Sequence, residues 1–558
     1  MVMEILLAYK ANAGAARDPF TSLLPVGLGY INASLRTKGF LSKVANFSRF
    51  SWREIAGHLT DQPPAILGIS QFTHNRFDSL KLARLAKEIN PSCLVVFGGP
   101  HATHRWHDIL SRNVSVDYVV LGEGEETFCE LAESLLREQG NRPGSVRGIA
   151  YRLSGSIATS PPREPLADVD ALPAPAAFYD GFIGVDIHRQ LEFIVTSRGC
   201  PASCRFCSSP NFWGGALRFR SPQSIVDEIK FIRDRYGLIY FSIRDDTFTA
   251  DRKRVVEFCR LLIQEKVYVL WNCQSRVNAV DEDILFWMKR AGCECVQFGV
   301  ESGSVRVLRA LGKSITPDQI RKAADLTRRA GMYLSLYLMT GMPGETEDDL
   351  KETLALIDSV KASDGQVSPL VYYPGTSLFT DGVVSGIVRE DLFEADKREA
   401  LSARSDAFVG NSVNALLKRL GSVAEKNIYT GADYHAQKKA LGYCHATNIM
   451  AGEFFESQGK WREAEEEYRE ICDREPENPW GWLMTGELNA RRKDFNRARH
   501  AFERLLTLVP AHAPAFSHLG EICRLEGDGE AALGYYRKAL SLAPYDVTSR
   551  DGLKRYNG

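Results

Sequence analysis

Three cysteines lie close together near the middle of the chain. Cys200, Cys204 and Cys207 occur in the segment Thr-Ser-Arg-Gly-Cys-Pro-Ala-Ser-Cys-Arg-Phe-Cys-Ser. Such a trio of thiolates can bind three irons of a cubane [4Fe–4S] cluster and leave the fourth iron without a protein ligand. An open metal position favours chemistry over a structural role. A zinc knuckle is the alternative, but it needs a fourth ligand, and the nearest histidine, His188, lies before the loop.

The cysteines follow the apolar run Leu191–Val195, which predicts a strand, and they therefore lie on a strand-exit loop. Phe206 precedes the last cysteine. The pattern resembles the radical S-adenosylmethionine (SAM) superfamily, in which a Cys-x3-Cys-x2-Cys loop holds the cluster. That resemblance implies that SAM occupies the fourth iron and that one electron cleaves it to methionine and a 5′-deoxyadenosyl radical.

Residues 189–380 alternate strands with helices, and a polar or glycine-rich cluster follows each strand. Such clusters can converge at one end of a βα barrel. The spacing alone predicts a parallel α/β domain, and the resemblance implies a partial (βα)6 barrel. The residues then expected to contact SAM are Phe206, Asp245, Asp246, Arg276, Glu301, Gly341, Pro343 and Gly344.

Several of these residues have simpler alternatives. Glu301 could accept the ribose hydroxyls, as acids do on Rossmann sheets, or cap the following helix. Arg276 could bind the SAM carboxylate or pair with the acids at 281–282. Asp245 and Asp246 could bind the SAM ammonium, position substrate or cap a helix.

Two tyrosines end the last expected strand, Val367–Val371. Adjacent strand residues point to opposite faces, so only one of Tyr372 and Tyr373 is expected to face the cavity. Tyr372 is the candidate catalytic residue, and packing is the alternative.

Residues 1–150 also alternate strands and helices, which predicts a doubly wound parallel sheet. Ligands of such sheets bind beyond the carboxyl ends of the strands. The motifs at these ends resemble the cobalamin-binding domain that precedes the cluster in one large radical SAM subclass (class B type), although the glycines could simply make tight turns. The resemblance implies cobalamin contacts from Ser70, Gly98, Gly99, Pro100, His101, Gly122, Glu123, Gly124 and Glu125.

The C-terminal residues 446–558 repeat with a period of 34, as Gly452, Gly486 and Gly520 illustrate. This period is typical of tetratricopeptide repeats, which are stacked helix pairs. The repeats are expected to bind a protein partner, with stiffening of the enzyme or self-association as alternatives. Proline-rich residues 151–188 predict a linker, and residues 381–445 predict a helical bridge.

The composition of the chain narrows the classes of protein to which it can belong. A net charge of −1 over 558 residues argues against a nucleic-acid partner. No apolar stretch approaches the ~18 residues of a transmembrane segment, and the N-terminus reads as a strand rather than a signal. Twelve cysteines without a disulfide-scaffold pattern suit a reducing cytoplasm.

The sequence therefore predicts an α/β enzyme with a Rossmann-like cobalamin-binding domain, a partial radical SAM barrel and an all-α repeat array. The expected cofactors are a [4Fe–4S] cluster, SAM and cobalamin. The expected reaction is C-methylation of an unactivated carbon of a small-molecule substrate, with an electron donor for the cluster. Ring closure, rearrangement or oxidation without methyl transfer is one alternative. A repeat-based scaffold with a vestigial cobalamin domain is the other.

Overall fold

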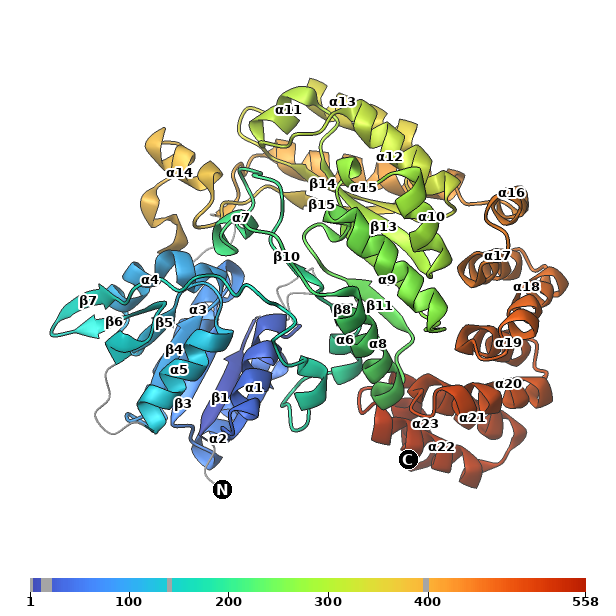
Figure 1. The fold of residues 1–558 in the computed structure, drawn as a ribbon, viewed down its shortest axis with the longest axis horizontal. Coiled ribbons are helices and arrows are strands. Elements are labelled where there is room, and N and C mark those ends of the chain that lie inside the picture. Colours follow the sequence, from blue (N-terminus) through green and yellow to red (C-terminus); the bar gives the residue numbers. More distant parts are fainter. Residues whose placement is uncertain (1–3, 12–22, 138–142, 395–400, 558) are drawn as a thin grey trace.

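Three parts follow one another along the chain (Figure 1). The computed structural model describes residues 4–11, 23–137, 143–394 and 401–557. A seven-stranded sheet comes first, a six-stranded parallel sheet second and a helical array last. The first part and the helical array lie on opposite sides of the central sheet, to the left and right of Figure 1.

The N-terminal sheet has the strand order β2-β1-β3-β4-β5-β6-β7, and its first five strands are parallel. Helices α1 and α5 pack on one face through residues such as Leu28 and Phe128. Helices α2, α3 and α4 pack on the other through residues such as Ile55, Leu82 and Ile109. The predicted doubly wound sheet is therefore confirmed. The bounds are β1 Ile5–Tyr9, α1 Val26–Thr37, β2 Ser42–Asn46, α2 Trp52–Asp61, β3 Ile66–Ser70, α3 Arg76–Ile89, β4 Leu94–Gly98, α4 Pro100–Arg112, β5 Tyr118–Val120, α5 Glu125–Leu136, β6 Ile149–Leu153 and β7 Ser156–Thr159.

The boundary predicted between this domain and the linker is wrong by about one hairpin. Strands β6 and β7 fall after residue 148 and extend the sheet as an antiparallel pair. Tyr151 and Ile157 pack against the two cores of the N-terminal sheet, so the start of the proline-rich segment belongs to the domain rather than spacing it from the next.

The central sheet has the order β15-β14-β13-β12-β11-β8, and every pair in it is parallel. Its spatial order follows the chain order, as a partial βα barrel requires. A two-stranded ribbon, β9–β10, lies beside it. The bounds are α6 Ile187–Leu191, β8 Phe193–Ile194, β9 Ser197–Arg198, α7 Ser209–Phe212, β10 Arg218–Phe219, α8 Pro222–Tyr236, β11 Tyr240–Ile243, α9 Arg252–Gln264, β12 Leu270–Ser275, α10 Glu282–Arg290, β13 Cys293–Glu301, α11 Val305–Ala310, α12 Pro317–Arg329, β14 Tyr333–Thr340, α13 Glu347–Val360, β15 Asp364–Pro369 and α14 Ser377–Val384.

Two predictions around this sheet need correction. The strand expected at Leu191–Val195 is only β8, because Asp186 caps helix α6 and that helix runs to Leu191. The predicted bridge 381–445 contains α15, Ala407–Lys426, which belongs to the barrel. Its Leu416 and Leu420 join the core of the central sheet, so α15 covers the edge strand β15.

The C-terminal helices form the predicted repeats. Each of the three 34-spaced glycines packs against an aromatic ring of the next helix: Gly452 on Tyr468, Gly486 on Phe502 and Gly520 on Tyr536. A Cβ at these glycines would lie 2.2–2.6 Å from those rings, which explains the small residue in every repeat. The helices are α16 Gly431–Leu441, α17 His445–Ser457, α18 Trp461–Arg474, α19 Pro479–Arg491, α20 Phe495–Leu508, α21 Ala513–Glu526, α22 Gly529–Leu542 and α23 Val547–Asn557.

The repeat array packs against the barrel at the amino ends of its strands. Ile239, just before β11, lies in a hydrophobic cluster with residues of α19–α21. Leu270, the first residue of β12, packs with residues of α17–α19. Lys289 of α10 is fully buried and donates to the Gly331 carbonyl at 2.9 Å and to the Met450 sulfur at 2.9 Å. These contacts make the array a support for the end of the barrel away from the cysteines.

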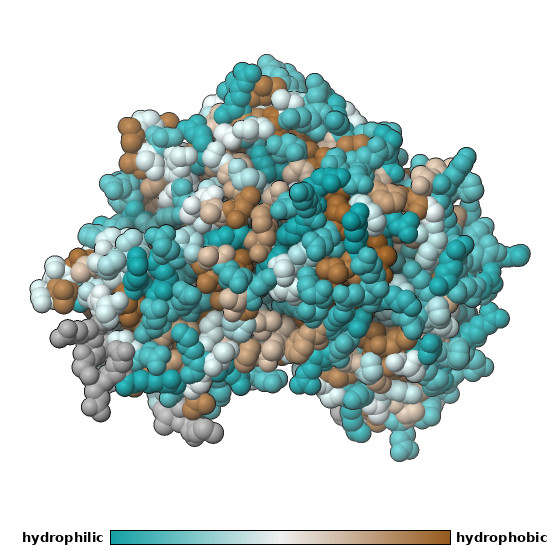
Figure 2. All heavy atoms as spheres, viewed as in Figure 1, coloured by the Kyte–Doolittle hydropathy of each residue, from teal (hydrophilic) through white to brown (hydrophobic). Residues whose placement is uncertain are grey.

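The outer edge of the array, at the right of Figure 2, is largely hydrophilic. Among the described residues, the structure contains no helix long and apolar enough to cross a membrane.

Candidate active site

The cysteine loop is closed by the ribbon of β9 and β10. Arg198 and Arg218 lie directly opposite each other in this antiparallel pair. Gly199 follows β9 with φ +92°, and a Cβ there would lie 2.6 Å from the Ala216 carbonyl. Only glycine fits this close turn, which starts the loop immediately before Cys200.

The three cysteines are free thiols that are neither fully buried nor fully exposed. Burial raises the pKa of Cys207 to about 11, and Asp246, Cys204 and Cys200 add to the rise, so these groups lie near one another. Within the described ranges, no three Cys, His, Asp or Glu side chains converge as ligands of a single ion. Three thiols on one loop, none of them in a disulfide, fit a cubane cluster, in which each thiolate binds a different iron.

Arg276 lies beside the cysteines. Its guanidinium is 3.7 Å from the Cys204 sulfur, and the residue is 8% exposed. The alternative pairing does not occur, because Asp281 bonds to Arg252 and Glu282 to Arg329. Arg276 also lines a cavity of about 480 Å³ on the outer side of the loop.

Glu301 ends β13 in a left-handed conformation, with φ +67°. This φ is unusual for a residue other than glycine, and such strain is concentrated at functional sites. Its carboxylate forms a buried ion pair with Lys313 instead of capping α11, whose N-cap is Ser304. The segment before Lys313 contacts the cysteine loop, because Arg205 N donates to the Leu311 carbonyl at 2.9 Å. Glu301 is therefore coupled to the loop through one short segment.

The two aspartates after β11 have different surroundings. Asp245 is fully buried and accepts from Thr196 N at 2.6 Å and Ser197 N at 3.1 Å, with Arg254 at 3.4 Å. It therefore fixes the chain just before the cysteine loop. Neither aspartate caps the next helix, since the N-cap of α9 is Asp251.

Asp246 points toward the cysteine loop and accepts a hydrogen bond from Ser209. Burial raises the pKa of Asp246 and the charge of Asp245 adds to this, while the bond from Ser209 opposes it. Because Asp246 lines the same cavity as Cys207, it is the aspartate placed to contact a ligand there.

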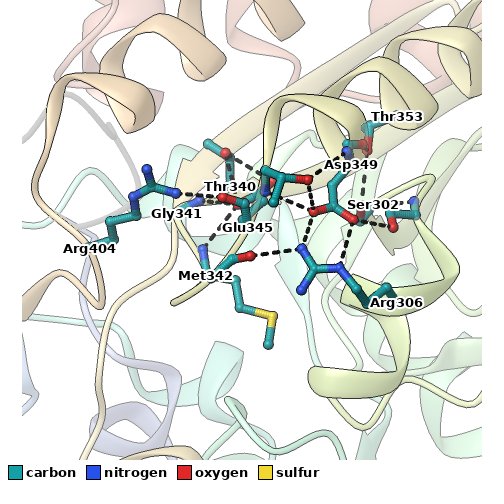
Figure 3. A network of polar contacts seen from close by, with 12 residues as sticks. Ser302, Arg306, Thr340, Gly341, Met342, Glu345, Asp349, Thr353 and Arg404 are labelled. Atoms are coloured by element: carbon teal, nitrogen blue, oxygen red, sulfur yellow. Dashed lines mark hydrogen bonds and ion pairs between the residues drawn. The ribbon is translucent and has the colours of Figure 1, made fainter. Parts of the chain in front are cut away.

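The glycine-rich turn after β14 is held by a network of hydrogen bonds (Figure 3). Glu345 accepts from Gly341 N at 2.6 Å and Met342 N at 3.1 Å, and Arg404 donates to its carbonyl at 2.7 Å. Gly341 and Gly344, which flank Pro343, have φ of +89° and +78°. Glu345 holds the turn from within, and the expected contact of Gly341, Pro343 and Gly344 with SAM stays a prediction.

The two tyrosines that follow β15 have different surroundings. Tyr372 is 2% exposed and packs in a hydrophobic cluster that also takes in Phe206, Leu370 and Phe379. Its neighbour Tyr373 is 42% exposed, and burial around its hydroxyl and then the nearby Cys207 sulfur raise the pKa of that hydroxyl. Tyr372 is thus buried by packing, which was the alternative, and Tyr373 becomes the candidate to face the site.

A cavity of about 420 Å³ lies at the carboxyl ends of the N-terminal strands. Its floor and walls include most of the residues predicted to contact cobalamin, namely Ser70, Gly98, Gly99, Pro100, Gly122, Glu123, Gly124 and Glu125. Its other side consists of loop and barrel residues, namely Cys207, Ser208, Ser209, Phe212, Trp213 and Asp246. The cavity thus joins the two α/β domains beside the cysteines.

The glycines around this cavity fit a large flat ligand. A Cβ at Gly27 or Gly122 would meet nothing within 4 Å, and one at Gly98 would meet only Val120 at 3.8 Å. These positions therefore face open space that a side chain would fill. Gly99 has a different role, because its Cβ would lie 2.9 Å from the Gln71 carbonyl.

Three of the predicted cobalamin residues are engaged with protein instead. His101 is buried below the cavity and hydrogen-bonds Thr73 at 3.1 Å; burial and the nearby arginines lower its pKa to about 3, so the ring is neutral. The carboxylates of Glu123 and Glu125 bind arginines of the β9–β10 ribbon. Sequence reasoning missed these arginines and the aromatic pair Phe212-Trp213, although that pair directly follows the cysteines.

Comparisons with known proteins agree with this architecture. The chain matches the radical SAM superfamily profile over residues 194–357, the B12-binding domain over 19–132 and a tetratricopeptide repeat over 490–547. An uncharacterised methyltransferase of Pyrococcus horikoshii is 31% identical over 393 residues, which cover 69% of this chain and 84% of that protein.

Two further relatives are more distant. The anaerobic magnesium-protoporphyrin IX monomethyl ester cyclase of Rubrivivax gelatinosus is 28% identical over 340 residues, 59% of this chain and 61% of that protein. The solved structure of the radical SAM methyltransferase TsrM from Kitasatospora setae, with tryptophan and a SAM analogue bound, is similar in fold. Its TM-score is 0.61 at 16% identity, over 78% of this chain and 90% of that one.

The fold, the cysteine loop and these similarities define a class: the chain belongs to the cobalamin-binding radical SAM enzymes, here with C-terminal tetratricopeptide repeats. Its cofactors are accordingly a [4Fe–4S] cluster, SAM and cobalamin, as the sequence predicts.

The open glycine positions allow a direct test of the cobalamin cavity. Gly27→Leu places a side chain in that cavity, and we expect hydroxocobalamin binding to weaken by about 10- to 100-fold, since overpacking costs about 1–3 kcal/mol. Gly57→Leu is the matched control, because Gly57 is also an exposed helical glycine with nothing within 4 Å but lies outside the cavity. Equal binding by the two variants, measured by spectral titration, would place the ligand elsewhere.

Proposed function

We propose that this protein is a cobalamin-dependent radical SAM methyltransferase that methylates an unactivated carbon of a small molecule. The cluster and SAM supply the radical that removes hydrogen from the substrate, and cobalamin supplies the methyl group. The observation that carries the proposal is the shared cavity, which runs from the glycines of the cobalamin domain to Cys207 and Trp213 of the cysteine loop.

The lining of this cavity suits a reaction that must exclude water. Leu7, Leu28, Ile31, Val96 and Phe128 of the N-terminal domain face it. An apolar, closed site protects reactive groups from side reactions, and a pocket between domains is a usual place for a large ligand. Of the acids on the cavity wall, Glu123 and Glu125 are paired with arginines, which leaves Asp246 to bind a donor group of the substrate.

On the barrel side of the site, three protein features are proposed to bind SAM. Arg276 lies beside Cys204 and offers its fork of donors to the SAM carboxylate. Glu301 is positioned by Lys313 to accept hydroxyl donors, as the ribose of SAM offers. The hydrogen-bonded turn Gly341–Glu345 offers a backbone edge for the adenine.

A second candidate reaction is cyclisation or oxidation without methyl transfer. It is favoured by the similarity to cyclases such as that of Rubrivivax gelatinosus, of which the chain spans less than two thirds. Both reactions start with the same hydrogen abstraction, and they differ in whether the product carries a new methyl group.

The distinguishing experiment uses the anaerobically reconstituted enzyme, methyl-deuterated SAM and a candidate metabolite pool. We expect a product whose mass is increased by a deuterated methyl group, together with 5′-deoxyadenosine. A product with 5′-deoxyadenosine but no deuterium would identify the second reaction instead.

The repeats and the cellular location complete the proposal. Because the array packs on the barrel through Ile239, Leu270 and Lys289, it first serves to stiffen the enzyme, and its hydrophilic outer edge is left for a protein partner. All twelve cysteines are free thiols, which suits a reducing compartment such as the cytoplasm.

A further inference from the structure

Four buried charges join the cobalamin domain to the cysteine loop. Arg198 donates to Glu123 at 2.6 Å and also to Glu125, while Arg218 donates to the other oxygen of Glu123 at 2.6 Å. The four side chains are only 6–10% exposed. The two acids belong to the N-terminal domain, and the two arginines belong to the ribbon beside the barrel.

The two arginines bracket the cysteines. Arg198 lies two residues before Cys200, and Arg218 follows the loop in β10. They are directly opposite in the ribbon, where two like charges repel unless something compensates them. Glu123 and Glu125 provide that compensation, so the ribbon that closes the cysteine loop depends on acids of the other domain.

The acids lie on the wall of the cobalamin cavity. Residues Gly122–Glu125 form one side of it, and Cys207–Trp213 of the bracketed loop form the other. Arg198 also lies between Tyr30 of the N-terminal domain and Trp213, with ring centroids at 5.6 and 5.3 Å. A ligand in the cavity thus touches both segments that the charges hold together.

We propose that Arg198, Arg218, Glu123 and Glu125 act as positioning residues that couple cobalamin binding to the cluster loop. Cys200, Cys204 and Cys207 would hold a cluster and thereby fix one wall of the cavity, and the ion pairs fix the opposite wall against it. Because coupling between two sites is reciprocal, each cofactor increases the affinity of the protein for the other.

The test measures hydroxocobalamin affinity twice, by anaerobic equilibrium dialysis of the iron-free protein and of the cluster-loaded protein. For the wild type we expect the cluster to tighten cobalamin binding by about 5- to 150-fold, the usual range of coupling between sites. In the double variant Arg198→Met, Glu125→Met, which removes two opposite charges together and keeps the Glu123–Arg218 pair, we expect that ratio to fall toward one.

Matched controls separate coupling from general damage. Arg163→Met with Glu130→Met removes an ion pair that lies on the N-terminal side alone, and the ratio should keep its wild-type value. Glu125→Gln keeps the shape of the four-residue cluster and should lower the ratio partly. This variant provides the test if the double variant does not fold. Cluster content is followed by iron analysis and electron paramagnetic resonance. The proposal is overturned if the wild-type ratio of cobalamin affinities with and without the cluster is one. It is also overturned if that ratio is unchanged both in the double variant and in Glu125→Gln.

Discussion

Replacing Cys200, Cys204 or Cys207 singly by alanine is expected to lower the formation of 5′-deoxyadenosine from SAM by at least about 10³-fold. All three thiols come from one loop, and among the described residues no other cysteine lies on that loop. Iron bound after anaerobic reconstitution should fall from about four per chain to a small fraction of that. The cobalamin affinity of each variant should equal that of the iron-free wild-type protein.

Cys472→Ala is the control for this series. Cys472 is also a partly exposed thiol, but it lies in α18 of the repeats, far from the loop in sequence and beside Thr485. Its iron content and 5′-deoxyadenosine formation should match the wild type. If any of the three loop variants retains both properties, that residue is no ligand.

Removing the repeats is the second change with a large expected effect. A chain that ends at residue 443 exposes Ile239 and Leu270, which are 4% and 3% exposed in the full chain, and removes Met450 from the buried Lys289. Burial of two such side chains contributes about 3–6 kcal/mol. For a domain of this size the unfolding temperature of the barrel should therefore fall by about 6–24 °C, measured by calorimetry.

A shorter truncation provides the comparison. A chain that ends at residue 527 lacks α22 and α23 but keeps the buried repeat residues that pack on Ile239 and Leu270. Its barrel should unfold within a few degrees of the full-length protein. Equal stability of both truncated chains would show that the array does not support the barrel and would favour a role in partner binding alone.

Elements with a strong local pattern could be predicted from the sequence. The alternation of strands and helices predicted for residues 1–150 occurs in the structure, for example in β1, β3 and α3. The 34-residue period located the repeats, because a glycine must face an aromatic ring in each one. The spacing of the cysteines identified the cluster loop for a similar reason, since the ligands are local in sequence.

Elements that depend on distant partners were missed. Strand β2, Ser42–Asn46, is short and only weakly apolar, and its pairing with β1 defines it. Helix α15 was expected in a bridge, since nothing local shows that Leu416 and Leu420 cover β15.

The same limit explains the site residues that changed role. Glu123 and Glu125 follow a strand like ligand-binding acids, but their partners are 75 and 73 residues away in Arg198. Tyr372 and Tyr373 lie after the end of β15, and only the packing of Tyr372 against distant residues such as Phe206 and Phe393 distinguishes them. Charge pairing between domains is thus visible only once both domains are in place.

The most direct test of the account is electron paramagnetic resonance of the reduced, anaerobically reconstituted protein before and after addition of SAM. We predict a [4Fe–4S] signal whose g-values change when SAM is added, because the iron left free by Cys200, Cys204 and Cys207 binds it. A signal that is the same with and without SAM, or a loop that binds zinc and no iron, would contradict the account.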